Sequence, residues 1–448
     1  MSHKYFITAL ISTFWVTAFW TTAVIASAAH ADDTLTESAQ PGSFGKTLSL
    51  QEALETALNN NQGLAELQLM AESANAVPSQ DGALPDPTLG FNALNLPTDS
   101  FDRDQEPMTQ MQISLSQTFP FPGKRGLKRE ASERDASAAR KQVLDKRLQI
   151  AAAVRGAWWQ LAYLDHAIEI IQQNQGLMRD FIQIAQTKYK VGKGLQQDVL
   201  LAQLELSRLL NRQLPLEGMR SASQADLNAL MNRPANQPVR LPETAPNINL
   251  PELASQTTLL NQALGARPIL DVERERVEAA RLRMDVAKKD SYPDFTLGAG
   301  YGFRDGTDAT GRDLPDLASF RFSINLPIYS SSKQSKLYEQ RSSDYFGRKH
   351  AFNESVRSVD AAISRNYAYY QAARDQVSLY GKAIIPQARQ TVSAMLSAYQ
   401  VNQVDFLNVL NTQITLYNAQ ISYWEALSNA KQSLANLAAS VGSENLYE

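Results

Sequence analysis

The sequence predicts a mainly α fold with a small β part, built as two similar halves. Over residues 111–119, apolar and polar side chains alternate with the period of two that is typical of a strand. Pro120 ends this strand, and the proline-free residues 124–214 that follow favour long helices. Residues 320–326 alternate in the same way before Pro327, which lies 207 positions after Pro120. This recurrence indicates an internal duplication.

Composition limits the classes of protein that the chain can represent. The 448 residues are 44% hydrophobic and 20% charged, which is ordinary for a folded protein and argues against disorder. A net charge of -3 gives no basic stripe for nucleic acid, so no nucleic-acid partner is expected. The chain has no cysteine, which excludes disulfides, thiolate metal sites and a cysteine nucleophile, and suits an oxidising compartment.

The N-terminus predicts export from the cytoplasm. An apolar run covers residues 5–29, and Ala29-His30-Ala31 fits the small-x-small pattern that signal peptidase recognises. We expect a signal peptide over residues 1–31 and a mature chain that begins at Asp32, with an uncleaved membrane anchor as the alternative. No later segment offers about 18 consecutive apolar residues, so no further transmembrane helix is expected.

The first repeat is expected to span residues 32–250. A helix begins at the capping box formed by Ser49 and Glu52 and runs toward Val77, where Pro78 is expected to end it. Two strands follow, and a glycine turn then divides the long proline-free stretch into two antiparallel helices. A proline-rich crossover closes the repeat. The strands, turn and crossover are expected at residues 87–94, 111–119, 192–194 and 232–251.

The second repeat, residues 251–448, has the same order of elements. Its turn begins at Tyr399, which lies 210 positions after Tyr189 in the first turn. Each half therefore consists of a helix, a hairpin of two strands, a helix, a turn and a helix. The helix starts and strands of the second repeat are expected at Pro268, Lys333, 294–303 and 319–328.

The four strands have the dimensions of membrane strands. Each has roughly the 9 to 11 residues that cross a bilayer when tilted, with one apolar face and one small polar face. Four strands cannot close a barrel, because the smallest membrane barrels have about eight. Open sheet edges are not tolerated in hydrocarbon, so several chains must pool their strands. The alternative is a soluble sandwich with helical insertions, which has too few strands to cover such long helices.

The chain resembles the TolC family of outer-membrane efflux proteins over essentially its whole mature length. The resemblance rests on the helix start at residues 48–54, the paired Pro-Asp strand openings, both strand-to-helix junctions, and the turn motifs at residues 189–203 and 399–413. The junction Phe119-Pro-Phe-Pro-Gly-Lys-Arg125 is more similar to the heavy-metal branch, for cobalt-zinc-cadmium or copper and silver efflux, than to the drug and haemolysin branch.

The resemblance implies a homotrimer with a twelve-stranded β-barrel in the outer membrane of a Gram-negative cell. It also implies an α-helical tunnel through the periplasm, a periplasmic adaptor (membrane fusion protein) and an inner-membrane pump of the resistance-nodulation-division (RND) type. The chain would then be the passive exit duct of a tripartite efflux system, with heavy-metal ions as the substrate. The alternatives are a multidrug or type I secretion duct, or a non-conducting structural or adaptor protein of the envelope.

The resemblance also places a periplasmic gate near the two turns, often ringed by acidic side chains. Asp198 occupies such a position, and Asp405 is a substitute candidate in the second motif, where Asn408 and Asn411 stand at positions that can hold aspartates. The alternative is that both aspartates are ordinary helix N-terminal acids that interact with the helix dipole. An adaptor is expected to dock at the turns, through Tyr189, Gly192, Gly194, Tyr399 and Asn402.

No catalytic, cofactor or metal site is expected. Beyond the signal peptide the only histidines are His166 and His350, and the nine methionines are scattered. The loop at Asp305 is not an EF-hand, because Thr310 stands where the glycine is required. The sequence therefore predicts a protein that is not an enzyme.

Overall fold

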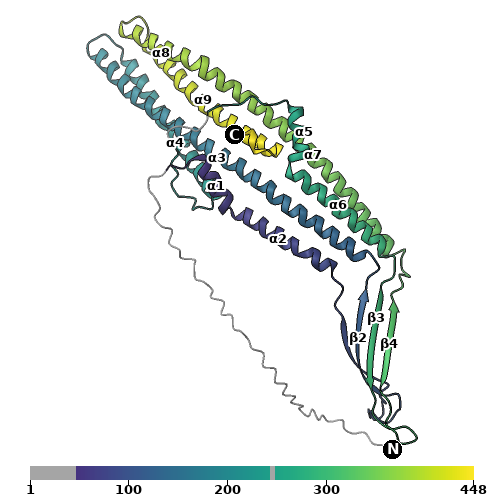
Figure 1. Cartoon of the computed structure of the whole chain (residues 1–448). Helices are drawn as coiled ribbons and strands as arrows, with labels where there is room; N and C mark the ends of the chain where they lie inside the picture. The colour runs from purple at the N-terminus through teal and green to yellow at the C-terminus, as the bar shows by residue number, and fades with distance from the viewer. Residues whose placement is uncertain (1–46, 243–247, 448) are drawn as a thin grey trace, which may run out of the picture. The chain divides into compact units, whose positions relative to one another are not determined.

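The computed structural model describes residues 47–242 and 248–447, so the expected signal peptide at residues 1–31 lies outside it. In the described unit, long helices run side by side and a four-stranded sheet continues from one end of them (Figure 1). Within these ranges, none of the helices combines the length and the apolar character of a membrane span.

The order of elements repeats along the chain. In each half two helices lead into two strands, and a long helix, a turn and a returning helix follow. The first half contains α1 (Leu50–Asn60), α2 (Gln62–Gly82), β1 (Thr88–Leu94), β2 (Gln110–Phe119), α3 (Lys124–Lys190) and α4 (Gln196–Leu230). The second contains α5 (Gln256–Ala266), α6 (Pro268–Lys289), β3 (Phe295–Phe303), β4 (Leu317–Ile324), α7 (Gln334–Leu379), the π-helix η1 (Tyr380–Ile384), α8 (Ile385–Gln400), α9 (Phe406–Val441) and the 3-10 helix η2 (Glu444–Leu446).

The first helix begins as predicted but ends differently. The Ser49 hydroxyl accepts from the backbone N–H of Glu52, and the Glu52 carboxylate accepts from that of Ser49, which completes the capping box. The break comes at Asn61, whose side chain caps α2 by accepting from the N–H of Leu64 at 3.1 Å. The prediction that Pro78 ends the helix is wrong, because α2 packs along α3 and this contact outweighs the one backbone hydrogen bond that proline removes.

The sheet joins the two halves. Its strand order is β1-β2-β3-β4 with every neighbour antiparallel, so the β2–β3 pair connects residues from the two repeats. The register places Phe91 beside Ile113 and Ile113 beside Tyr301, which gathers the apolar side chains on one face. The other face carries glycines and small polar side chains, including Gly300 and Ser319. Large apolar side chains are exposed in this single chain, with Phe320 at 89%.

The fourth strand is shorter than predicted. A strand over residues 319–328 was expected, with Pro327 as its end, but β4 covers Leu317–Ile324. Its partner β3 begins at Phe295, which pairs with Ile324, and Pro293 precedes β3 in a segment without regular structure. The ladder therefore ends before Pro327 because no β3 residue remains opposite.

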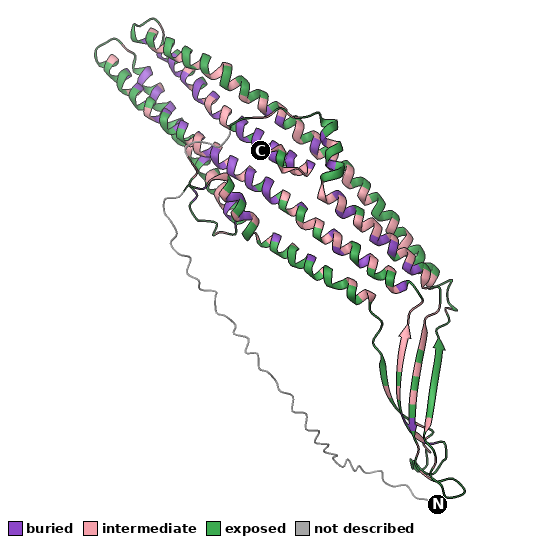
Figure 2. Cartoon of the chain, viewed as in Figure 1, coloured by how far each residue is buried: buried purple, intermediate pink, exposed green. Residues whose placement is uncertain are grey.

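The core follows the contact between the helices of the two halves. Buried side chains lie mainly on the inner helices of the bundle, α3 and α9, while α2, α4, α7 and α8 are exposed along one side (Figure 2). Trp158 and Trp159 are both fully buried on α3, within this apolar core. The indole N–H of Trp158 donates to the carbonyl oxygen of Leu48, and that of Trp159 donates to the hydroxyl of Tyr447.

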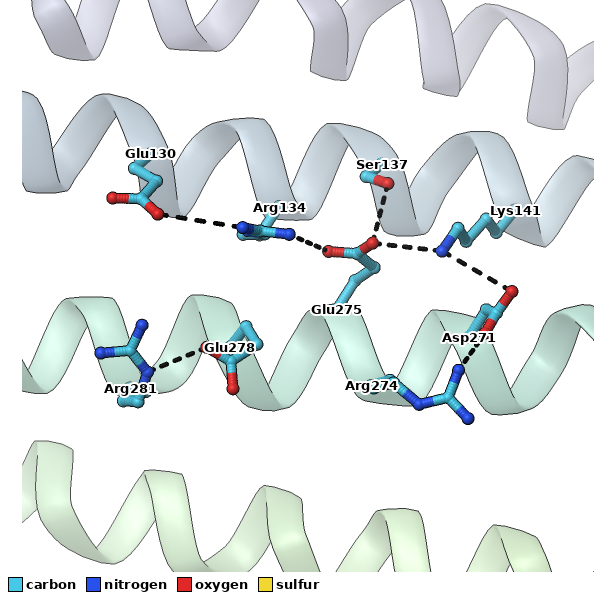
Figure 3. Close-up of polar contacts among 9 residues, drawn as sticks. All are labelled: Glu130, Arg134, Ser137, Lys141, Asp271, Arg274, Glu275, Glu278 and Arg281. Atoms are coloured by element: carbon cyan, nitrogen blue, oxygen red, sulfur yellow. Dashed lines mark hydrogen bonds and ion pairs between the residues drawn. The ribbon is translucent and has the colours of Figure 1, made fainter. Parts of the chain in front are cut away.

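Polar contacts hold α3 against α6 (Figure 3). The Glu275 carboxylate of α6 accepts from Arg134, Ser137 and Lys141 of α3 at 3.3, 3.2 and 3.1 Å. Burial alone would raise the pKa of Glu275, but the hydrogen bonds from Lys141 and Arg134 outweigh it and lower the pKa below its usual value. This network joins α3 of the first half to α6 of the second half.

Candidate functional site

The two turns at the tips of the helical hairpins have the same backbone. The α3–α4 turn and the α8–α9 turn both place a residue at positive φ, Gly192 at 73° and Asn402 at 58°. The N–H of each donates to the carbonyl oxygen of the tyrosine three positions earlier, Tyr189 or Tyr399, at 3.0 and 3.1 Å. The same spacing of 210 residues that relates the two repeats therefore also relates these two backbone hydrogen bonds.

Gly194 lies close to the last turn of α3. A Cβ at this position would lie 2.8 Å from the Cβ of Lys188 and 3.1 Å from the backbone nitrogen of Tyr189. The residue 210 positions later is Val404, which is half-buried. At this position the two turns therefore differ in side chain, while their backbone hydrogen bonds match.

Lys188 ties the two turns together. Its Nζ donates to the carbonyl oxygen of Tyr399 at 2.7 Å and to the side-chain oxygen of Asn402 at 2.8 Å. The same ammonium lies 3.9 Å from the centre of the Tyr399 ring. One lysine of the first hairpin thus binds the second hairpin in three ways.

The two equivalent tyrosines occupy different environments. Tyr399 is only 6% exposed, whereas Tyr189 is 50% exposed. The ring of Tyr399 packs against Phe406 at the start of α9, with ring centres 5.5 Å apart. Burial raises the pKa of the Tyr399 hydroxyl, and the negative charge of Asp198 raises it further. Among the described residues this hydroxyl has no hydrogen-bond partner.

The two candidate gate aspartates also differ. Asp198 is buried in the first turn of α4, whereas Asp405 is exposed as the N-cap residue of α9. Burial raises the pKa of Asp198, the backbone N–H of Leu195 opposes this, and the nearby charge of Asp405 adds to the rise while Lys188 opposes it. The structure thus brings the two carboxylates into electrostatic contact at the tip.

Asn408 and Asn411 are exposed on α9. In the described part of the chain, neither side-chain amide forms a hydrogen bond to Asp198 or Asp405. The sequence analysis did not identify Lys188. No local pattern marks it, because its partner Tyr399 lies 211 residues further along the chain.

A resident metal site has no support in the described ranges, where no three side chains of His, Cys, Asp or Glu come together. The tip can therefore act through hydrogen bonds, charge and packing.

Comparison with known proteins identifies the family. The sequence profile described as "Outer membrane efflux protein" matches residues 53–233 and 259–443. The chain belongs to this family. It is an efflux channel of the outer membrane with a periplasmic helical part, and not an enzyme.

Individual members of the family are distant relatives. The cobalt-zinc-cadmium resistance protein CzcC of Cupriavidus metallidurans is 22% identical over 396 residues, which cover 87% of this chain and 89% of that protein. The pyoverdine export outer membrane protein OpmQ of Pseudomonas putida is 23% identical over 405 residues, covering 88% and 84%. The solved structure of CusC matches with a TM-score of 0.73 at 15% identity, covering 88% of this chain and 92% of that chain. The likeness to CusC confirms the predicted fold.

Proposed function

We propose that three copies of this chain form the exit duct of a tripartite efflux system, each giving four strands to one closed barrel. The observation that carries the proposal is the sheet. Its apolar face is exposed, and among the described residues β1 and β4 each pair on one side only. Hydrocarbon covers such a face, but an unpaired strand edge in hydrocarbon is costly. Pairing of β1 of one copy with β4 of the next removes that cost, because it satisfies the backbone groups of both edges.

The helices support the same ring. Within the chain α3 packs on α9. In the repeat, α3 of the first half corresponds to α7 and α8 of the second half, and α9 of the second half corresponds to α4 of the first. The equivalent faces of α8 and α4 are therefore complementary between neighbouring copies. On α4, Leu200, Leu204 and Leu214 are 56%, 48% and 67% exposed in the single chain. Burial of these leucines stabilises the assembled ring.

The helical tips form the periplasmic entrance in this proposal. Asp198 and Asp405 supply the negative charge at the gate, with Asn408 and Asn411 further along α9. An adaptor docks on the outer side of the turns, at Tyr189, Gly192, Gly194 and Asn402, while buried Tyr399 supports the second turn from inside. The adaptor and an inner-membrane RND-type pump supply the substrate and the energy.

Heavy-metal ions are the proposed substrate. The support is CzcC, whose name states cobalt, zinc and cadmium resistance and whose match spans most of both chains. The second candidate is a small organic molecule, because OpmQ, with a match of similar extent, is named for pyoverdine export.

Growth of a deletion strain tests the substrate. The strain is grown on copper, silver, zinc, cobalt and cadmium salts, and on dyes, bile salts and antibiotics, with and without the gene on a plasmid. Sensitivity to one or a few metals that the plasmid reverses is the expected result. Sensitivity to organic compounds alone would overturn the metal assignment and leave the duct intact. Heat-resistant trimers are assayed separately in the outer-membrane fraction of the plasmid-bearing strain, and their absence would contradict the proposed assembly.

A further inference from the structure

A cavity of about 370 Å³ lies between α1, α3, α9 and the C-terminal residues. One wall consists of three leucines of α1, namely Leu50, Leu54 and Leu58. The opposite wall holds two aromatic rings and two cations, from Trp159, Tyr447, Arg155 and Lys431. The cavity lies partway along the helices, away from the paired turns, near the C-terminus marked in Figure 1.

Lys431 is a buried cation without a buried counter-ion. Its residue is 3% exposed, and Nζ donates to the carbonyl oxygen of Asn249 at 2.8 Å. The rings of Trp159 and Tyr447 lie 5.6 and 5.8 Å from Nζ. Among the described residues, no carboxylate lies within ion-pair distance of Nζ. Two of its three N–H donors are therefore left for another acceptor.

Burial lowers the pKa of Lys431 to about 8, so most of the amines still carry a proton at neutral pH. A charged ammonium in a buried site is costly unless an anion accompanies it.

Two carboxylates, Glu55 and Glu444, and two cations, Arg155 and Lys431, line the cavity, and of these four only Glu444 and Arg155 form an ion pair. Arg155 is 5% exposed, and its guanidinium lies 4.4 Å from the Tyr447 ring centre and 3.5 Å from the Glu444 carboxylate. Glu55 stands at the exposed rim, where its carboxylate accepts from Gln51 at 2.7 Å. Glu444 therefore compensates Arg155, and Lys431 remains without an anion.

We propose that this cavity binds a small organic monoanion, a carboxylate attached to an apolar group. The carboxylate accepts from Lys431 and Arg155, and the apolar group lies against the leucines of α1. A single missing negative charge favours a carboxylate over a dianionic phosphate. A volume near the lower end of the usual range for ligand pockets favours a short alkyl or phenyl group. The site stands independently of the efflux function, which uses neither Lys431 nor Arg155.

Calorimetry with 4-phenylbutanoate tests the proposal. The full chain is held in an amphiphilic polymer without free detergent at pH 7, and the uncharged 4-phenylbutan-1-ol serves as the matched ligand. We expect saturable binding of the carboxylate and at least roughly tenfold weaker binding of the alcohol. Absence of saturable binding at millimolar carboxylate, or equal affinity for the two ligands, would overturn the proposal.

Variants identify the site. Lys431→Met keeps the length of the side chain and removes its charge, and we expect it to weaken carboxylate binding by roughly tenfold or more. Lys382→Met on exposed η1 is the control and leaves the affinity unchanged. Leu58→Gln lowers the affinity for 4-phenylbutanoate while the cations remain in place. Unchanged binding in both Lys431→Met and Leu58→Gln contradicts the assignment to this cavity.

Discussion

The ammonium of Lys188 lies 3.9 Å from the centre of the Tyr399 ring and donates to the carbonyl oxygen of the same residue at 2.7 Å. Both partners lie at helical tips, each far from the sheet along its own helix (Figure 1). Together with the hydrogen bond from the same ammonium to Asn402, this contact joins the tips of the two hairpins.

Replacing Lys188 by methionine is expected to loosen the two tips from each other. The cation–π contact and the two hydrogen bonds together contribute about 1–3 kcal/mol. Hydrogen exchange should therefore quicken at residues 188–195 and 399–405, while amides at Trp158 and Trp159 keep their protection. Lys190→Met, which changes an exposed lysine of the same turn, is the control. Equal exchange in both variants would show that the contact does not hold the tips.

Removing the charge of Asp198 is expected to stabilise the protein at neutral pH. The pKa of Asp198 is raised in the folded state, so the folded protein keeps this proton at pH values where the unfolded chain has lost it. The contribution of Asp198 to stability is therefore full in acid and is lost as pH rises through the raised pKa. Asp198→Asn should raise the thermal midpoint at pH 7 and change it little below pH 3.8. Asp180→Asn, on the exposed side of α3, should show no such pH dependence.

Substitution should destabilise the first turn at one of its two glycines and leave it nearly unchanged at the other. Gly194→Ala places a methyl group 2.8 Å from the Cβ of Lys188, and we expect a loss of about 1–3 kcal/mol in stability of the turn. Gly192→Asn should be nearly neutral, because Asn402 adopts the same positive φ in the second turn and a Cβ at Gly192 meets nothing within 4 Å. Protease cleavage at the turn measures the difference, and equal cleavage of the two variants would contradict it.

A charge on the apolar face of the sheet should block assembly in the membrane. Phe322→Arg puts a guanidinium where lipid is proposed, at a cost of roughly 2–4 kcal/mol per chain near the bilayer centre. Ser323→Arg is the matched control, because Ser323 lies on the other face, which already carries Arg321. The yield of heat-resistant oligomer in the outer-membrane fraction should fall only for Phe322→Arg. A similar fall in oligomer yield for both variants would contradict the proposal that lipid covers the face that carries Phe322.

Lys431 should make stability depend on pH in the alkaline range. Its pKa falls from 10.5 to about 8 on folding, so the unfolded chain binds more protons between these values and stability rises with pH across that window. Lys431→Met should therefore raise the free energy of unfolding at pH 7 by up to about 3 kcal/mol. The advantage should vanish above pH 10.5, as followed by thermal unfolding. A constant advantage at every pH would assign the gain to packing alone.

Periodicity and turn residues were sufficient to predict the hairpin turns, the duplication and the four strands apart from the end of β4, because these features depend on local sequence. The break at Asn61 and the passage of α2 through Pro78 were not predictable, because the packing of α2 on α3 decides them. For the candidate site, the sequence located the turns and both aspartates. It did not separate buried Asp198 from exposed Asp405, since both stand at the start of a helix that follows an equivalent turn.

The lysine that joins the tips has no copy in the second repeat, where Ala398 stands 210 positions later. In the proposed ring, first and second hairpins alternate around the axis, so contacts within a chain alternate with contacts between chains. Every second contact between tips is therefore made by Lys188, and in the contacts between chains Ala398 takes the place of the lysine opposite Tyr189. The pseudo-sixfold ring is reduced to true threefold symmetry at its entrance. Its six hairpins then separate most easily as three rigid pairs.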